Sequence, residues 1–316
     1  PTLYLVGGGD PTVVRTDQSV AVPSYPRPAS YADLAQRTAA ALGPGSSVKL
    51  RIDTSLEDGP AKAPGWQPNY VTEGDVTPPS ALELDEGRLD PTNLDSERTP
   101  TPTAQAAAAL ASLLEADGVH VKGTVKPATA PPTAQPVADI QSPPLSQLVQ
   151  RMLTVSDNDL AEALGRAVAR HAGADPSFTG AATSVMNGLK DFGVSPELVS
   201  LDDTSGLSHD DRVAPQALID VLRAATSAQR PALRSIVEGL PVGGLTGTLS
   251  DRYRDKADRG GAGLVRAKTG TLTSVNTLAG LVVDHDGRLL MFALMASRAG
   301  NSAQALAAID QAAATL

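Results

Sequence analysis

The pattern of apolar and polar positions changes about half-way along the chain. Up to residue 126, short alternating or apolar runs that are typical of strands take turns with apolar residues at helical spacing. The strands and helices predicted for this part cover residues 3–6, 31–42, 48–52, 81–84, 104–117 and 119–126. Because strands and helices alternate, we expect a small α/β unit here.

A dense run of prolines marks the end of this part. Six prolines fall within residues 127–144, which is typical of an extended connector. Apolar residues at helical spacing follow, then strands, then a closing helix. These elements cover residues 145–153, 157–170, 179–192, a helix from 215, strands 264–268, 278–283 and 289–295, and helix 302–316. The pattern predicts two domains, residues 1–141 and 142–316, in a mixed α/β (α+β) protein.

Composition removes several classes of function. The chain has 316 residues, a net charge of −9 and no cysteine, which excludes disulfides, thiol catalysis and cysteine-based metal sites. The four histidines are not spaced as metal ligands, so neither a zinc site nor a histidine-based triad is favoured. The sequence has no basic stripe for nucleic acid and no apolar run long enough for a transmembrane helix. We expect no metal, no cofactor and no nucleic-acid partner.

The first motif that carries chemistry is Ser156-Asp157-Asn158, at the break between two predicted helices. A hydroxyl and a carboxamide two residues apart in a tight turn can point to one substrate, the hydroxyl relaying a proton and the amide binding a peptide bond. The alternative is structural, because Ser and Asp often cap the helix that follows them. A second S-x-N match, Ser274 to Asn276, shows that the pattern alone is weak.

The second motif is Lys268-Thr269-Gly270, followed by Thr271, at the end of a predicted strand. The lysine would present a positive charge to an anionic substrate, and the threonine hydroxyls would add hydrogen-bond donors. Gly270 would let a substrate backbone approach closely, because it has no Cβ. The alternative is a solvated lysine before an ordinary turn.

One S-x-x-K sequence occurs, from Ser46 to Lys49. Serine acylases with this motif place the serine and the lysine on one face of a helix. Residues 48–52 alternate as a strand does, and on a strand positions i and i+3 point to opposite faces. We therefore interpret Ser46 as a turn residue and Lys49 as a solvated one.

Together the two motifs resemble the signature set of penicillin-recognising serine enzymes. The surrounding sequence resembles the D-alanyl-D-alanine carboxypeptidase/endopeptidase family, the class C low-molecular-mass penicillin-binding proteins. The resemblance spans nearly the whole chain, and its motifs occur in the order of the family. The stretches that carry it are residues 2–12, 156–166, 202–215, 240–253 and 265–280.

This resemblance implies a fold and an activity. The lobe 142–316 would be β-lactamase/transpeptidase-like, and residues 1–141 would be an inserted accessory domain. The protein would cleave the terminal D-Ala of peptidoglycan stem peptides, or D-Ala cross-links, through an acyl-serine intermediate. It would be exported to the cell envelope or secreted, and β-lactams would inhibit it.

The resemblance also implies roles for single residues. Ser156 would shuttle a proton towards the leaving group, Asn158 would bind the substrate amide, and Lys268 would support the proton network and the anionic end of the substrate. Thr269 and Thr271 would hold the terminal carboxylate, and the Thr271 N–H would be one oxyanion-hole donor.

Further substrate contacts would come from Gly270 and from the segment Ser205-Gly206-Leu207, which would line the site. The sequence departs from the family in one respect, because a helical S-x-x-K motif is missing. We expect that motif on a segment upstream of residue 1, as a partner without which the 316 residues do not react.

Two other functions stay open at this stage. A β-lactamase shares the motifs, but the region 1–141 argues against a plain β-lactamase. A non-catalytic peptidoglycan-binding protein could retain the same site for muropeptides. An S-x-x-K helix upstream would favour the enzyme, and its loss would favour the binding protein.

Overall fold

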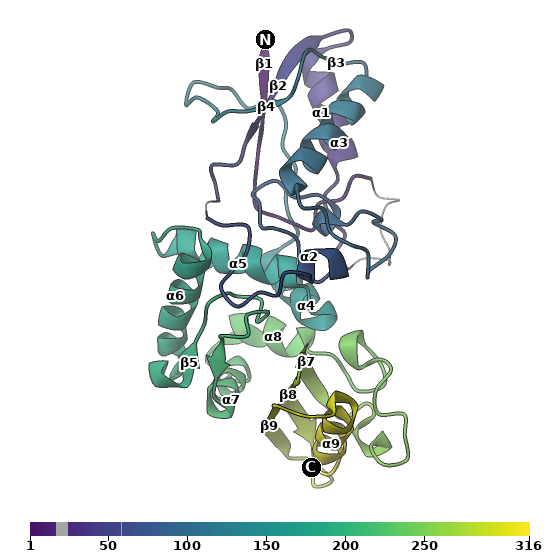
Figure 1. Cartoon of the computed structure of the whole chain (residues 1–316), viewed down its shortest axis with the longest axis vertical. Coiled ribbons are helices and arrows are strands. Elements are labelled where there is room, and N and C mark those ends of the chain that lie inside the picture. Colours follow the sequence, from purple (N-terminus) through teal and green to yellow (C-terminus); the bar gives the residue numbers. More distant parts are fainter. Residues whose placement is uncertain (17–24, 58) are drawn as a thin grey trace. The chain divides into compact units, whose positions relative to one another are not determined.

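The computed structural model describes residues 1–16, 25–57 and 59–316 (Figure 1). The chain forms two compact units. The first consists of residues 1–144 and 158–181, and the second of residues 145–157 and 182–316. Residues 158–181 group with the first unit, so these compact units are not the two segments 1–141 and 142–316 expected from the sequence. The expected division into domains stays a prediction. Within the described ranges, none of the helices combines the length and the hydropathy that crossing a membrane requires.

A parallel sheet forms the centre of the first unit. Strand β2 pairs with β1, β3 and β4, and α1 and α3 pack beside the sheet. Alternate residues of β2, such as Val48 and Leu50, are buried in the core. The elements are β1 (Thr2–Val6), α1 (Tyr31–Leu42), β2 (Ser47–Asp53), α2 (Tyr70–Glu73), α3 (Pro102–Ala116), β3 (His120–Val121), β4 (Lys126–Pro127) and α5 (Asn158–His171).

Two strand predictions in this unit were wrong in part or in whole. Residues 81–84 form no strand, because the main chain around them bonds to a loop: Gly9 N–H donates to Ala81 O and Asp85 N–H donates to Val13 O. Their apolar side chains are buried all the same. The expected strand 119–126 is two short strands, interrupted at Gly123, which has a φ of 72°.

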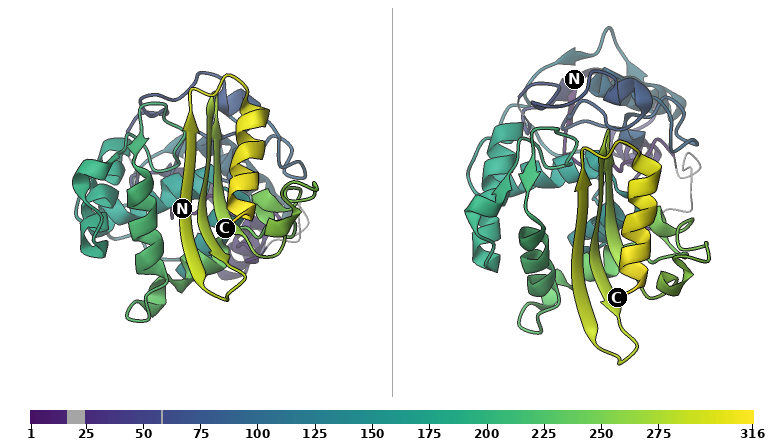
Figure 2. Two further views of the ribbon diagram at one scale, coloured as in Figure 1. Left: turned by 90° about the horizontal axis from the view of Figure 1, so that it is seen from below. Right: turned by 60° about the horizontal axis from the view of Figure 1, so that its bottom comes forward.

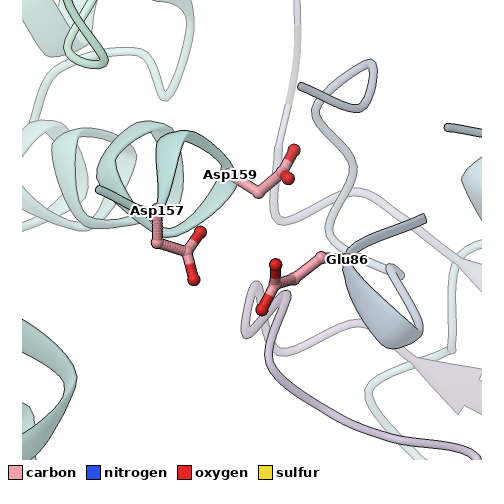
Figure 3. A group of neighbouring side chains, drawn as sticks. All are labelled: Glu86, Asp157 and Asp159. Carbon is pink, nitrogen blue, oxygen red and sulfur yellow. The ribbon is translucent and has the colours of Figure 1, made fainter. Parts of the chain in front are cut away.

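Buried charges join helix α5 to the loops of the first unit. The Arg98 guanidinium lies 3.6 Å from Asp159 Oδ2 and 3.8 Å from Glu86 Oε2. Figure 3 shows that Asp159 extends from the start of α5 and Glu86 from a separate turn. Arg166 is fully buried, bonded to Glu162 at 2.9 Å and stacked 4.4 Å from the Phe178 ring centre. These contacts explain why α5 groups with the first unit.

The second unit contains helices and an antiparallel sheet of β7, β8 and β9. Figure 2 shows these three strands side by side, with α9 along them. Apolar residues of the sheet and of α9, such as Leu278 and Ile309, form its core. The elements are α4 (Leu145–Val155), α6 (Phe178–Leu189, of which residues 182–189 belong to this unit), β5 (Val199–Ser200), β6 (Arg212–Val213), α7 (Pro215–Ala225), α8 (Arg234–Gly239), β7 (Arg266–Leu272), β8 (Val275–Val283), β9 (Leu289–Ser297) and α9 (Ser302–Ala314).

Candidate active site

Ser156 follows the last residue of α4 and has a left-handed backbone, with a φ of 59°. The Asp157 N–H donates to Met152 O at 3.0 Å, which is the bond that closes a helix with a left-handed residue after its end. Glycine is usual at this position because a Cβ costs about 1–2 kcal/mol there. Ser156 therefore keeps a backbone conformation that costs stability.

The Ser156 hydroxyl meets the side chain of Lys268 from the middle of β7. Lys268 Nζ donates to Ser156 Oγ at 2.7 Å and to the carbonyl oxygen of Thr269 at 2.7 Å. The Asp157 carboxylate is paired instead with Arg151, from Nε to Oδ2 at 3.2 Å. The contact between the two sequence motifs therefore spans 112 positions of the chain.

Burial of the Lys268 ammonium lowers its pKa from 10.5 to about 8. The charged form loses hydration there. A lysine with this pKa can give up and take back a proton near neutral pH, as a general acid or base must. Since its ammonium donates to the serine oxygen, the Ser156 hydroxyl hydrogen can be donated to a third group.

Thr269 lies beside Lys268 and bonds to a residue that the sequence did not indicate. The hydroxyls of Thr269 and Thr248 are 2.8 Å apart. Thr248 lies in a turn that packs against α4, since a Cβ added at Gly247 would lie 2.1 Å from Thr154 O. No local pattern marked Thr248, although it falls within the family-like stretch 240–253.

The N–H groups of Thr269 and Thr271 point to the edge of β7 that faces away from β8. The Ala267 N–H donates to Pro241 O at 2.9 Å, so it points away from β8. Since main-chain directions in an antiparallel strand repeat every two residues, the N–H groups of Thr269 and Thr271 point the same way. The Thr271 N–H is therefore directed away from β8.

Gly270 is required by its neighbour on β8. The two residues Gly270 and Thr277 are paired, and a Cβ at position 270 would lie 2.4 Å from Thr277 Oγ1. The second S-x-N match runs from the turn after β7 into β8, where Asn276 is buried and its amide donates to Ser302 Oγ at 2.9 Å. Its contact is with the first residue of α9.

Asn158 belongs to the first unit. Its Nδ2 donates to the Asp75 carbonyl oxygen at 2.9 Å. The structure thus brings Ser156, Lys268 and Thr269 together in the second unit. The side-chain contact of Asn158 is with Asp75, a residue of the first unit. The convergence of all four residues stays a prediction.

The segment Ser205-Gly206-Leu207 lies in a loop of the second unit, built around the buried carboxylate of Asp203. Asp203 accepts the N–H groups of Gly206 and Ser208, both at 2.7 Å. The sequence stretch around 202–215 pointed to this loop, but nothing in it indicated that Asp203 holds the loop together. The contact of this segment with substrate stays a prediction.

The S-x-x-K sequence lies elsewhere, in the first unit. Ser46 Oγ donates to the Leu42 carbonyl oxygen at 2.7 Å, and Lys49 is exposed on β2. The predicted strand is thus confirmed: Lys49 lies on β2, and Ser46 precedes it. That both are chemically silent stays a prediction.

A family comparison concerns the chain as a whole. The sequence model of the D-Ala-D-Ala carboxypeptidase 3 (S13) family matches residues 1–98 and 95–316. The chain belongs to this family. The resemblance seen in the sequence is thereby confirmed.

Two mycobacterial relatives match most of the chain. Carboxypeptidase DacB of Mycolicibacterium smegmatis is 40% identical over 99% of this chain and 67% of its own length. A carboxypeptidase of Mycobacterium tuberculosis is 38% identical over 94% of this chain and 63% of its own length. The chain therefore spans about two thirds of these relatives.

Solved structures show the fold. Penicillin binding protein 4 of Haemophilus influenzae superposes with a TM-score of 0.79 at 21% identity, covering 98% of this chain and 81% of that protein. A second structure of the same protein, in complex with a β-lactam, gives a TM-score of 0.76. The predicted fold class is confirmed.

Proposed function

We propose that the protein is a serine-type D-Ala-D-Ala carboxypeptidase that acts on peptidoglycan stem peptides outside the cytoplasm. Membership of the S13 family supports this activity. The main structural support for the active site is the 2.7 Å hydrogen bond from Lys268 Nζ to Ser156 Oγ. Desolvating the lysine and keeping Ser156 in a left-handed backbone both reduce the stability of the fold. A role of the two residues in proton transfer explains why this arrangement is present.

The nucleophile in this proposal is a serine on an S-x-x-K helix outside the 316 residues. The S-x-x-K sequence within them leads from a turn into a strand, and the relatives have additional length. The serine oxygen attacks the carbonyl carbon of the D-Ala–D-Ala bond, and its proton passes to the lysine of the same motif. The bond to the leaving D-alanine then breaks, and water later hydrolyses the ester.

Ser156 and Lys268 serve the leaving group in this scheme. The amine of the departing D-alanine takes the proton from the Ser156 hydroxyl, and Lys268 resupplies it. The pKa of Lys268, lowered to about 8 by burial, lets it donate without holding its proton too firmly. Asn158 would bind the substrate amide.

The other residues would hold the substrate. The Thr271 N–H at the strand edge would donate to the carbonyl oxygen as it becomes negative, with a second donor from the nucleophile segment. The hydroxyls of Thr269 and Thr248 and the charge of Lys268 would bind the terminal carboxylate. Gly270 and the segment 205–207 would line the site.

D-alanine release tests the proposal. A polypeptide extended to the length of the relatives should release D-alanine from a pentapeptide ending in D-Ala-D-Ala, and Lys268→Met should lower kcat by about 100-fold or more. Lys256→Met is the matched control, because Lys256 is an exposed lysine of the same unit. Binding of muropeptides without any release would favour the non-catalytic alternative. Release from cross-linked dimers would add endopeptidase action.

A further inference from the structure

The loop that contains residues 205–207 is bonded to the buried side chain of Asp203. Asp203 is fully buried. Its Oδ1 accepts the Gly206 N–H and its Oδ2 accepts the Ser208 N–H, each at 2.7 Å. The two bonds lie on either side of Leu207, so the position of this segment depends on the Asp203 carboxylate.

Asp211 is bonded to the same carboxylate. Its Oδ1 accepts the Asp202 N–H at 2.7 Å, and a side-chain hydrogen bond joins it to Asp203. Two carboxyl groups can share a hydrogen bond only when one of them carries a proton. Both oxygens of Asp203 already accept main-chain N–H groups, so the proton of the shared bond is assigned to Asp211.

The surroundings favour the proton on Asp211. Burial, and then the charges of Asp203 and Asp202, outweigh the Asp202 N–H and raise the pKa of Asp211 to about 7. The neighbouring Arg212 guanidinium donates to the main-chain oxygens of His209 and Asp211, at 2.9 and 2.7 Å. Among the described residues, the charged side chains that these contacts place next to Asp211 are Asp202, Asp203 and Arg212.

We propose that Asp203 and Asp211 are positioning residues, an acid pair whose shared proton fixes the segment Ser205-Gly206-Leu207 for substrate binding. When the proton leaves Asp211, the hydrogen bond is lost and two carboxylates face each other across a short distance. The Asp203 carboxylate then shifts, and the loop loosens. The role in substrate binding rests on the proposed function, whereas the acid pair itself does not.

The acid pair is tested on the 316-residue chain by NMR. Carboxyl carbon shifts should show one aspartate that titrates near pH 7, and Asp211→Asn should remove that titration. The exchange protection of the Gly206 and Ser208 amides should fall about fivefold to tenfold between pH 6 and 8, as expected for one lost hydrogen bond. In Asp211→Asn the protection should stay constant, because the amide N–H replaces the acid proton as donor.

Asp210→Asn is the matched control, since Asp210 is the exposed neighbour of Asp211. It should keep the titration and the pH-dependent protection. An aspartate titration confined to the usual range near pH 4, or the same fall of protection in Asp211→Asn, would overturn the acid pair.

Kinetics on the extended polypeptide test the positioning role. Loss of the Lys268 charge, whose pKa is about 8, raises KM for the pentapeptide at high pH in every variant, but the rise should begin lower, near pH 7, and be larger in the wild type and in Asp210→Asn than in Asp211→Asn. An identical rise of KM in Asp211→Asn would overturn the positioning role. Absence of D-alanine release in all variants would instead refute the proposed function, and the NMR result would still decide on the acid pair.

Discussion

Replacing Lys268 by methionine tests whether the surroundings of its ammonium lower its pKa. The change removes the charge and its bonds to Ser156 Oγ and Thr269 O, and it keeps most of the apolar stem. Burial lowers the Lys268 pKa from 10.5 to about 8. A difference of about 2.5 pKa units corresponds to about 3.4 kcal/mol between the two protonation states.

The sign of the pH dependence follows from proton binding. Between pH 8 and 10.5 the unfolded chain holds the Lys268 proton and the folded protein has released it. The free energy of unfolding therefore rises with pH in this window, by up to about 3 kcal/mol from this group. Below pH 8 the folded protein bears the full cost of the buried charge.

Urea unfolding followed by circular dichroism measures this contribution. Wild type and Lys268→Met are compared at pH 7, 8, 9, 10 and 10.5, so that groups common to both cancel in the difference. The difference should favour the wild type increasingly above pH 8. Lys256→Met, the exposed control, should show no such trend. A difference that is flat across the window would refute the buried-ammonium interpretation.

Three further substitutions test single features of the site. Ser156→Gly should be more stable than Ser156→Ala by about 1 kcal/mol in urea unfolding, because glycine tolerates the left-handed backbone; equal stabilities would show that the turn is unstrained. Gly270→Ala should lower the free energy of unfolding by about 1–3 kcal/mol, because the added Cβ clashes with Thr277 Oγ1. Adding Thr277→Ala should restore part of this stability, and a double variant no more stable than Gly270→Ala would contradict that cause. Thr248→Val should change stability by less than about 0.5 kcal/mol, because this threonine is exposed, yet raise KM for the pentapeptide about tenfold; an unchanged KM would remove Thr248 from the site.

The sequence predicted most of the regular elements, because their apolar spacing matches their burial. Helix α1 has the predicted bounds, and α4, α5, β8 and β9 lie within a few residues of the expected positions. The failure at residues 81–84 has a physical reason: a buried apolar run looks like a strand, but its main chain bonds to loops. Periodicity reports burial and cannot tell these two cases apart.

The candidate site was predictable only through its motifs. Periodicity placed Ser156 between two helices and Lys268 on a strand, but the contact between them is set by the tertiary fold. Thr248 was missed because its partner hydroxyl is 21 residues away and no spacing rule links them. Asp203 and Asp211 were missed for a related reason, since no spacing rule in a sequence marks two carboxyl groups that meet in the fold.

The central claim is that Ser156 and Lys268 serve a serine nucleophile that lies outside the 316 residues. Mass spectrometry of the extended polypeptide after timed exposure to benzylpenicillin tests it most directly, with the modified peptide identified by fragmentation. We predict a single acyl adduct on the serine of an S-x-x-K motif outside these residues, formed more slowly in Lys268→Met than in Lys256→Met. An adduct on Ser46 or Ser156, or equal rates in the two lysine variants, would contradict the account.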